Sequence, residues 1–102
     1  MKELIKDVEI MVVHEYFRAA AMFGKANNSN HESFAVILEE LEEADDKRFE
    51  FKGEFERFWS DVKKNTKNVS ALGNMQKLAV QTACEWVQVA AMCHKAMQNR
   101  EG

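Results

Sequence analysis

The chain has 102 residues, 46% of them hydrophobic and 30% charged, which is the length and composition of one globular domain spanning residues 1–102. It has no proline and four glycines. So few turn residues exclude a meander of short strands and predict an all-α fold. The net charge of −3 argues against a nucleic-acid polymer as partner, because such proteins neutralise many phosphates with basic surfaces. Without an apolar run of about 20 residues, neither a membrane anchor nor a secretory signal is expected, which favours a cytoplasmic protein.

Hydrophobic residues at helical spacing predict a first long helix over residues 2–23, ending at Gly24. A polar loop follows, and a second helix is expected to begin near His31. Ser29 and Glu32 have the spacing of a capping box at this start, in which each residue bonds the backbone near the other.

The second helix is predicted to continue to about residue 62, with Gly53 as the one place where it can kink or split. Residues 65–70 indicate a loop in which Ser70 is the N-cap candidate of a third helix over residues 71–97. The pattern as a whole predicts a bundle of long helices.

The third helix is too apolar to be a surface helix of a lone small domain. A monomer would expose much of Trp86, Val89, Ala90 and Cys93, so we expect a homo-oligomer, at least a dimer, that completes the bundle. Cys84 and Cys93 lie about 13 Å apart along this helix on opposite sides, so they cannot bridge each other and are expected to be buried free thiols.

Acidic residues concentrate in the second helix, where residues 39–50 hold seven of the 17 acids. Glu39, Glu40 and Glu43 share one helical face, on which each like-charge pair costs a few tenths of a kcal/mol. A divalent cation would reverse this cost. The alternative is an ordinary solvated helix face.

One polar stripe runs along the otherwise apolar third helix and contains Lys77, Gln81, Glu85, Gln88 and Lys95. A carboxylate on a largely buried helix must be paired, hydrated or bound to a metal, because an isolated buried charge is costly. Glu85 therefore needs a partner. A cation shared with the three glutamates of the second helix would provide one, and their hard oxygen ligands suit Mg²⁺.

These two elements resemble those of a known family. Residues 39–43, Glu-Glu-Leu-Glu-Glu, fit the EExxE motif of the MazG-like all-α nucleotide pyrophosphohydrolases, and residues 85–88, Glu-Trp-Val-Gln, stand where that family has ExxD. The flanking segments 31–40 and 85–92 are similar to small MazG-like proteins of phages and Gram-positive bacteria. The likeness covers roughly residues 14–97. It implies an oligomeric helical enzyme that hydrolyses a nucleoside triphosphate to the monophosphate and pyrophosphate with Mg²⁺, or with Mn²⁺ in its place.

The resemblance also implies roles for single residues. The metal-binding positions would be Glu39, Glu40, Glu43, Glu85 and Gln88. Glu40 or Glu43 would orient the attacking water as base. Lys77 or Lys95 would hold phosphate oxygens, the alternative being that both lysines are solvated.

Gln88 departs from the motif, since it replaces an aspartate and brings one negative charge less. Weakened metal binding and weakened or absent activity are therefore expected. The alternative function is a non-catalytic helical module that serves oligomerisation or binds nucleotides without hydrolysing them.

Overall fold

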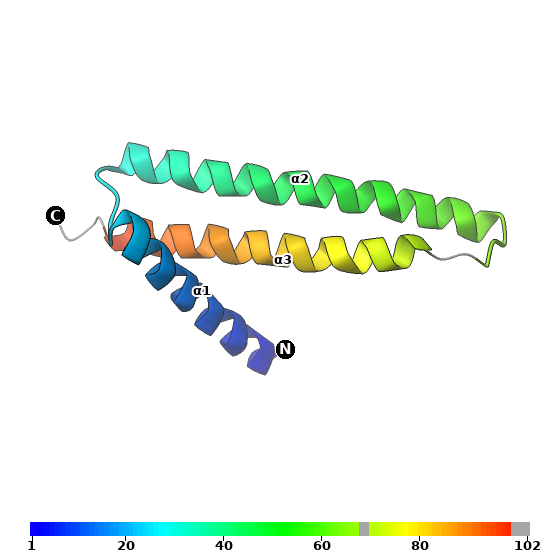
Figure 1. Ribbon diagram of the computed structural model, residues 1–102, viewed down its shortest axis with the longest axis horizontal. Coiled ribbons are helices and arrows are strands. Elements are labelled where there is room, and N and C mark those ends of the chain that lie inside the picture. The colour runs from blue at the N-terminus through cyan, green and yellow to red at the C-terminus, as the bar shows by residue number, and fades with distance from the viewer. Residues whose placement is uncertain (68–69, 99–102) are drawn as a thin grey trace.

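The computed structural model describes residues 1–67 and 70–98 and places three helices in them: α1 (Lys2–Phe23), α2 (Asn30–Lys63) and α3 (Ser70–Met97) (Figure 1). These residues contain no strand, which confirms the all-α prediction. None of the three helices combines the length and the apolar composition needed to cross a membrane.

Local chemistry sets the ends of the first two helices. α1 stops at Gly24, whose φ of 97° is open to glycine without strain and whose N–H donates to the carbonyl of Ala20. α2 is capped by Ser29, whose hydroxyl accepts from the backbone N–H of Glu32 at 3.1 Å. The Glu32 carboxylate accepts a hydrogen bond of 3.0 Å from the side-chain amide of Asn28.

α2 runs as one helix of 34 residues through Gly53. A Cβ atom added at Gly53 would meet no other atom within 4 Å. The packing of the helices therefore does not require a glycine at this position. Part of the predicted loop, residues 68–69, lies outside the described residues. α3 begins at Ser70, one residue before the expected start, and the Ser70 hydroxyl accepts a hydrogen bond of 3.1 Å from Arg57 of α2.

α2 and α3 form a long antiparallel pair, and α1 packs across one end of it before diverging toward its N-terminus (Figure 1). The molecule is therefore elongated, with extents of 60 × 30 × 21 Å. Its core lies where the three helices meet, around Tyr16, Ala91 and Met92. The Tyr16 hydroxyl donates to the carbonyl of Lys25 at 2.8 Å, and its ring meets the edge of His94.

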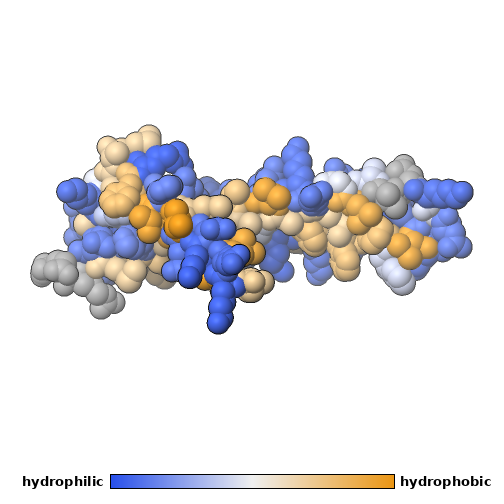
Figure 2. All heavy atoms as spheres, turned by 90° about the horizontal axis from the view of Figure 1, so that it is seen from below, coloured by the Kyte–Doolittle hydropathy of each residue, from blue (hydrophilic) through white to orange (hydrophobic). Residues whose placement is uncertain are grey.

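Because α1 diverges, part of α3 is left uncovered. Figure 2 views the molecule from the side of α1 and α3 and shows hydrophobic residues exposed along this face. Trp86 remains 48% exposed. The prediction of buried thiols is wrong for the single chain, since Cys84 and Cys93 are both free and exposed.

Candidate functional site

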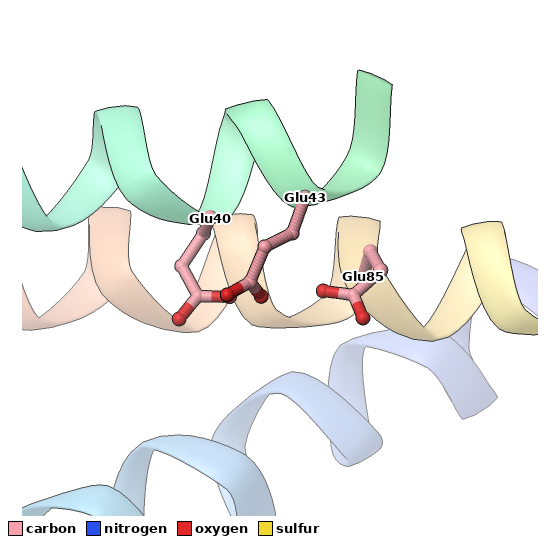
Figure 3. A group of neighbouring side chains, drawn as sticks. All are labelled: Glu40, Glu43 and Glu85. Carbon is pink, nitrogen blue, oxygen red and sulfur yellow. The ribbon is translucent and has the colours of Figure 1, made fainter. Parts of the chain in front are cut away.

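Three glutamates from two helices meet at the centre of the α2–α3 pair. Glu40 and Glu43 project from successive turns of α2 toward Glu85 of α3 (Figure 3). One carboxylate oxygen of each lies within 4.8 Å of the other two. The spacing of three residues puts Glu40 and Glu43 on one face, and the antiparallel packing sets that face against Glu85. We call these three residues the acidic triad.

Burial and the neighbouring negative charges disfavour the ionised forms of Glu40 and Glu85. Burial raises the pKa of Glu40, and the negative charges of Glu43, Glu85 and Glu39 raise it further. Burial also raises the pKa of Glu85, as do a hydrogen bond with Glu43 and the charge of Glu43, while the positive charge of Lys47 opposes this shift. The triad therefore holds negative charge at a cost that a proton or a cation would relieve.

Within residues 1–67 and 70–98, no ion pair includes a member of the triad. Among basic groups, Lys47 influences the triad through its positive charge, which lowers the pKa of Glu85. Exposed acidic groups are common in proteins that hold no ion, so the surroundings of the triad matter for what it can do.

Two of the five positions predicted to bind metal lie outside the triad. Glu39 is exposed and lines a neighbouring cleft. The side-chain amide of Gln88 donates a hydrogen bond of 2.6 Å to Glu15 of α1. Glu15 also accepts from Arg18 at 2.6 Å, and the hydrogen bonds from Arg18 and Gln88 lower the pKa of Glu15. Gln88 thus ties α3 to α1 at one edge of the site.

The neighbouring cleft has a volume of about 680 Å³ and is bounded by all three helices and the α1–α2 loop. It reaches the triad through Glu40, which lines both. Two polar residues that line the cleft are buried, although side chains of these types are usually exposed. Lys95 is 6% exposed and Asn27 is 7% exposed.

One of these two residues has a buried polar atom without a hydrogen-bond partner among the described residues. The Asn27 amide nitrogen donates to the hydroxyl of Ser33 at 2.8 Å, but its amide oxygen accepts no hydrogen bond. Lys95 takes part in none of the ion pairs among the described residues. Buried polar groups are normally paired, so the Asn27 amide oxygen, which is shielded from solvent, is one of the exceptions among the described residues.

The structure separates the two predicted phosphate-binding lysines. Lys95 shares the cleft with Glu40, whereas Lys77 is exposed and lines a different hollow with Gly73 and Gln81. Of the two, only Lys95 can reach a ligand that also contacts the triad side of the cleft.

Sequence reasoning missed three residues of this region, Glu15, Arg18 and Asn27. Glu15 and Arg18 are three positions apart on α1 and have the pattern of an ordinary surface ion pair. Asn27 lies in a polar loop, where asparagine is common because its side chain can hydrogen-bond the local backbone. The crossing of α1 over α3 brings Glu15 and Arg18 to the cleft, and the fold of the α1–α2 loop brings Asn27 there.

Comparison of the chain with protein-family models, curated proteins and solved structures finds no match. The resemblance to MazG-like enzymes therefore stays a prediction from two short motifs and their flanks. The functional argument depends on the geometry and chemistry of the triad and the cleft.

Proposed function

We propose that the protein is a Mg²⁺-dependent nucleoside triphosphate pyrophosphohydrolase of MazG-like type. The observation that carries the proposal is the meeting of Glu40 and Glu43 with Glu85 beside a cleft that contains the buried Lys95. Carboxylates suit Mg²⁺, and a cleft of several hundred Å³ suits a small-molecule ligand.

The triad suits a divalent cation by its charge and by its ligand atoms. One carboxylate oxygen of each residue lies within 4.8 Å of the other two, and carboxylate oxygens are the hard ligands that Mg²⁺ prefers. Glu40, Glu43 and Glu85 would hold the ion, and water and phosphate oxygens would complete its shell, as is usual for Mg²⁺.

When bound, Mg²⁺ supplies positive charge that neutralises the phosphates and acidifies the attacking water. Glu40 would orient this water and accept its proton. The water oxygen bonds to the α-phosphorus while the bond from that phosphorus to its bridging oxygen breaks. Pyrophosphate leaves with the electron pair, and the products are the nucleoside monophosphate and pyrophosphate.

The second candidate is a module that binds nucleotides without hydrolysing them. The hydrogen bond between Gln88 and Glu15 favours it, because it occupies the Gln88 amide in a tie between helices at the position where the motif has a metal-binding aspartate. This candidate predicts nucleotide binding without release of pyrophosphate.

We further propose that the chain works as a homo-oligomer. Its accessible surface is 7841 Å², about 1,900 Å² more than a compact chain of its mass would expose. Its radius of gyration is 17.6 Å, against about 13 Å for a compact domain of this length. Obligate dimers bury about 2,000–5,000 Å² in total, so a surplus of this size on each of two copies matches such an interface.

A second copy would cover the apolar groove between α1 and α3. This groove has a volume of about 460 Å³ and is lined by Val8, Met11, Val80, Trp86 and Val87 among others. The exposed hydrophobic surface continues beyond it on α1 and α3 (Figure 2). A face of this kind is typical of a protein interface.

Release of pyrophosphate from a panel of nucleoside triphosphates, with Mg²⁺, Mn²⁺ or EDTA, tests the enzymatic proposal. Wild type should release pyrophosphate only with metal, and Glu43→Gln should lose most of this activity. Glu42→Gln is the matched control, because Glu42 is exposed on the same helix outside the triad. Nucleotide binding without release in wild type supports the binding module, and neither binding nor release contradicts both candidates.

A further inference from the structure

We propose that Arg18 of α1 binds a phosphate group of the nucleotide through the part of its guanidinium that Glu15 leaves open. The inference rests on the proposed function, since it adds a phosphate-binding residue for the same substrate. It goes beyond the acidic motifs, which lie on α2 and α3, and beyond the two lysines of α3 that the resemblance implies for this role.

Three hydrogen bonds converge on one carboxylate oxygen of Glu15. Nε and Nη2 of Arg18 donate to Oε2 at 3.2 Å and 2.6 Å, and Nε2 of Gln88 donates to the same atom at 2.6 Å. The carboxylate is thus held from α1 and from α3, and it in turn orients the guanidinium. An aspartate at position 88, as in the motif, would bring Glu15 a second negative charge instead of an N–H.

The pair of Glu15 and Arg18 differs from an ordinary surface ion pair. Arg48 and Asp45 on α2 are also three positions apart, but their atoms are 3.8 Å apart and their side chains are 69% and 60% exposed. The Glu15 side chain is only 27% exposed. Exposed pairs are weak in part because holding two side chains in one geometry costs entropy. The contact with Gln88 already holds Glu15 in place, which lowers this cost for Arg18.

The position of Arg18 suits a ligand in the cleft. Arg18 and Glu40 line the same cleft, and Gln88 follows Glu85 by one helical turn, a rise of about 4.5 Å. The Arg18 side chain is 67% exposed, so a ligand can reach it. Two of its five N–H groups bond Glu15, and the other three bond no described residue.

A phosphate group matches these donors in shape and in charge. Its oxygens accept parallel hydrogen bonds from a guanidinium, which is why arginine is so frequent in phosphate sites. The three carboxylates of the acidic triad, when ionised, outweigh the two positive charges of one Mg²⁺. A further positive group beside the triad therefore favours the binding of phosphates.

Binding of inorganic tripolyphosphate to the full chain with Mg²⁺ tests the contact without a base or a sugar. Calorimetry should give an affinity about tenfold lower for Arg18→Gln than for wild type, the effect of one hydrogen bond to a charged group. Arg48→Gln is the matched control, since it removes the same charge from an ion pair of the same spacing outside the cleft. It should bind like wild type. Both arginine side chains are exposed, so neither substitution disturbs the core.

Arg18→Lys separates a directed contact from the effect of charge alone. Lysine keeps the positive charge but lacks the planar fork of N–H groups, so this variant should recover only part of the lost affinity. Full recovery would overturn the assignment of the guanidinium. Equal affinities of Arg18→Gln and Arg48→Gln, or no binding of tripolyphosphate to wild type, overturn it as well.

The outcome is separable from that of the proposed function, which the release of pyrophosphate decides. Binding of tripolyphosphate that depends on Arg18, in a protein that releases no pyrophosphate, supports the phosphate contact and contradicts the enzyme. Release of pyrophosphate by wild type, with equal affinity of wild type and Arg18→Gln for tripolyphosphate, supports the enzyme and overturns the role of Arg18.

Discussion

The side-chain amide of Gln88 on α3 donates a hydrogen bond of 2.6 Å to the carboxylate of Glu15 on α1. The two residues are 73 positions apart in the chain, and their contact joins the end of α1 that crosses α3 to the helix that carries Glu85. A glutamine at this position thus has a structural partner of its own. Its departure from the motif need not be read only as the loss of a metal ligand.

Exchanging the two groups tests this tie. Gln88→Glu alone places two carboxylates against each other and should lower the free energy of unfolding by about 1–3 kcal/mol, the cost of losing a hydrogen bond to a charged group. Adding Glu15→Gln restores a donor and an acceptor in reversed order and should recover most of the loss. Urea unfolding of the two single variants and the double variant measures this coupling. Additive losses would show that the two side chains do not interact in solution.

The triad predicts opposite effects of one substitution with and without metal. In EDTA, Glu43→Gln should raise the free energy of unfolding by a few tenths of a kcal/mol, because it removes like-charge repulsion from Glu40 and Glu85. With excess Mg²⁺ the order should reverse, since wild type gains more from an ion that binds only the folded state.

Thermal unfolding in EDTA and in Mg²⁺ at matched ionic strength measures this reversal. Glu42→Gln serves as control, because it removes the same charge from the same helix outside the triad. If Mg²⁺ stabilises all three proteins equally, the acidic face is merely solvated.

The triad should also set a pH dependence. The raised pKa values of Glu40 and Glu85 mean that the folded chain binds more protons than the unfolded chain above the ordinary glutamate pKa of 4.5. Their contribution to stability is therefore fully present below pH 4.5 and is lost as the pH rises through the raised values. Affinity for Mg²⁺ should rise over the same window, because the ion requires ionised carboxylates.

Unfolding in EDTA at a series of pH values from 4.5 to neutrality, compared between wild type and Glu43→Gln, isolates this contribution, because removal of Glu43 brings both pKa values closer to normal. The lowered pKa of Glu15 acts in the opposite sense, with stability lost as the pH falls below 4.5, so the two effects occupy different windows. A stability difference between the two proteins that does not change with pH would contradict the assignment to the triad.

The fold was largely predictable because its signals are local. Gly24 and the Ser29 cap end α1 and begin α2 through contacts within four residues, and the sequence contains both partners of each contact. Gly53 could not be decided in the same way. A glycine inside a helix lowers helix stability by about 1 kcal/mol relative to alanine. Whether the helix continues through it depends on the packing between α2 and α3, which the sequence does not show.

The candidate site was predictable only in part, for a geometric reason. The shared face of Glu40 and Glu43 follows from their spacing, and the polar stripe of α3 pointed to Glu85 as their neighbour. The exclusion of Glu39 depends on the rotation of α2 against α3, which side-chain packing sets. Asn27 reaches the cleft only through the fold of the α1–α2 loop, which no spacing in the sequence encodes.

The uncovered face of α3 predicts a dimer or larger assembly at micromolar concentration, held in part by Trp86 in the groove between α1 and α3. Trp86→Glu places a charge in that groove, so the variant should sediment as a monomer and unfold at a lower temperature. Its melting temperature should no longer rise with protein concentration, as that of wild type should. Trp59→Glu is the control, because Trp59 is similarly exposed but lies on α2 outside the groove. Sedimentation velocity of wild type and both variants decides the matter, and a folded wild-type monomer throughout the micromolar range would refute the assembly.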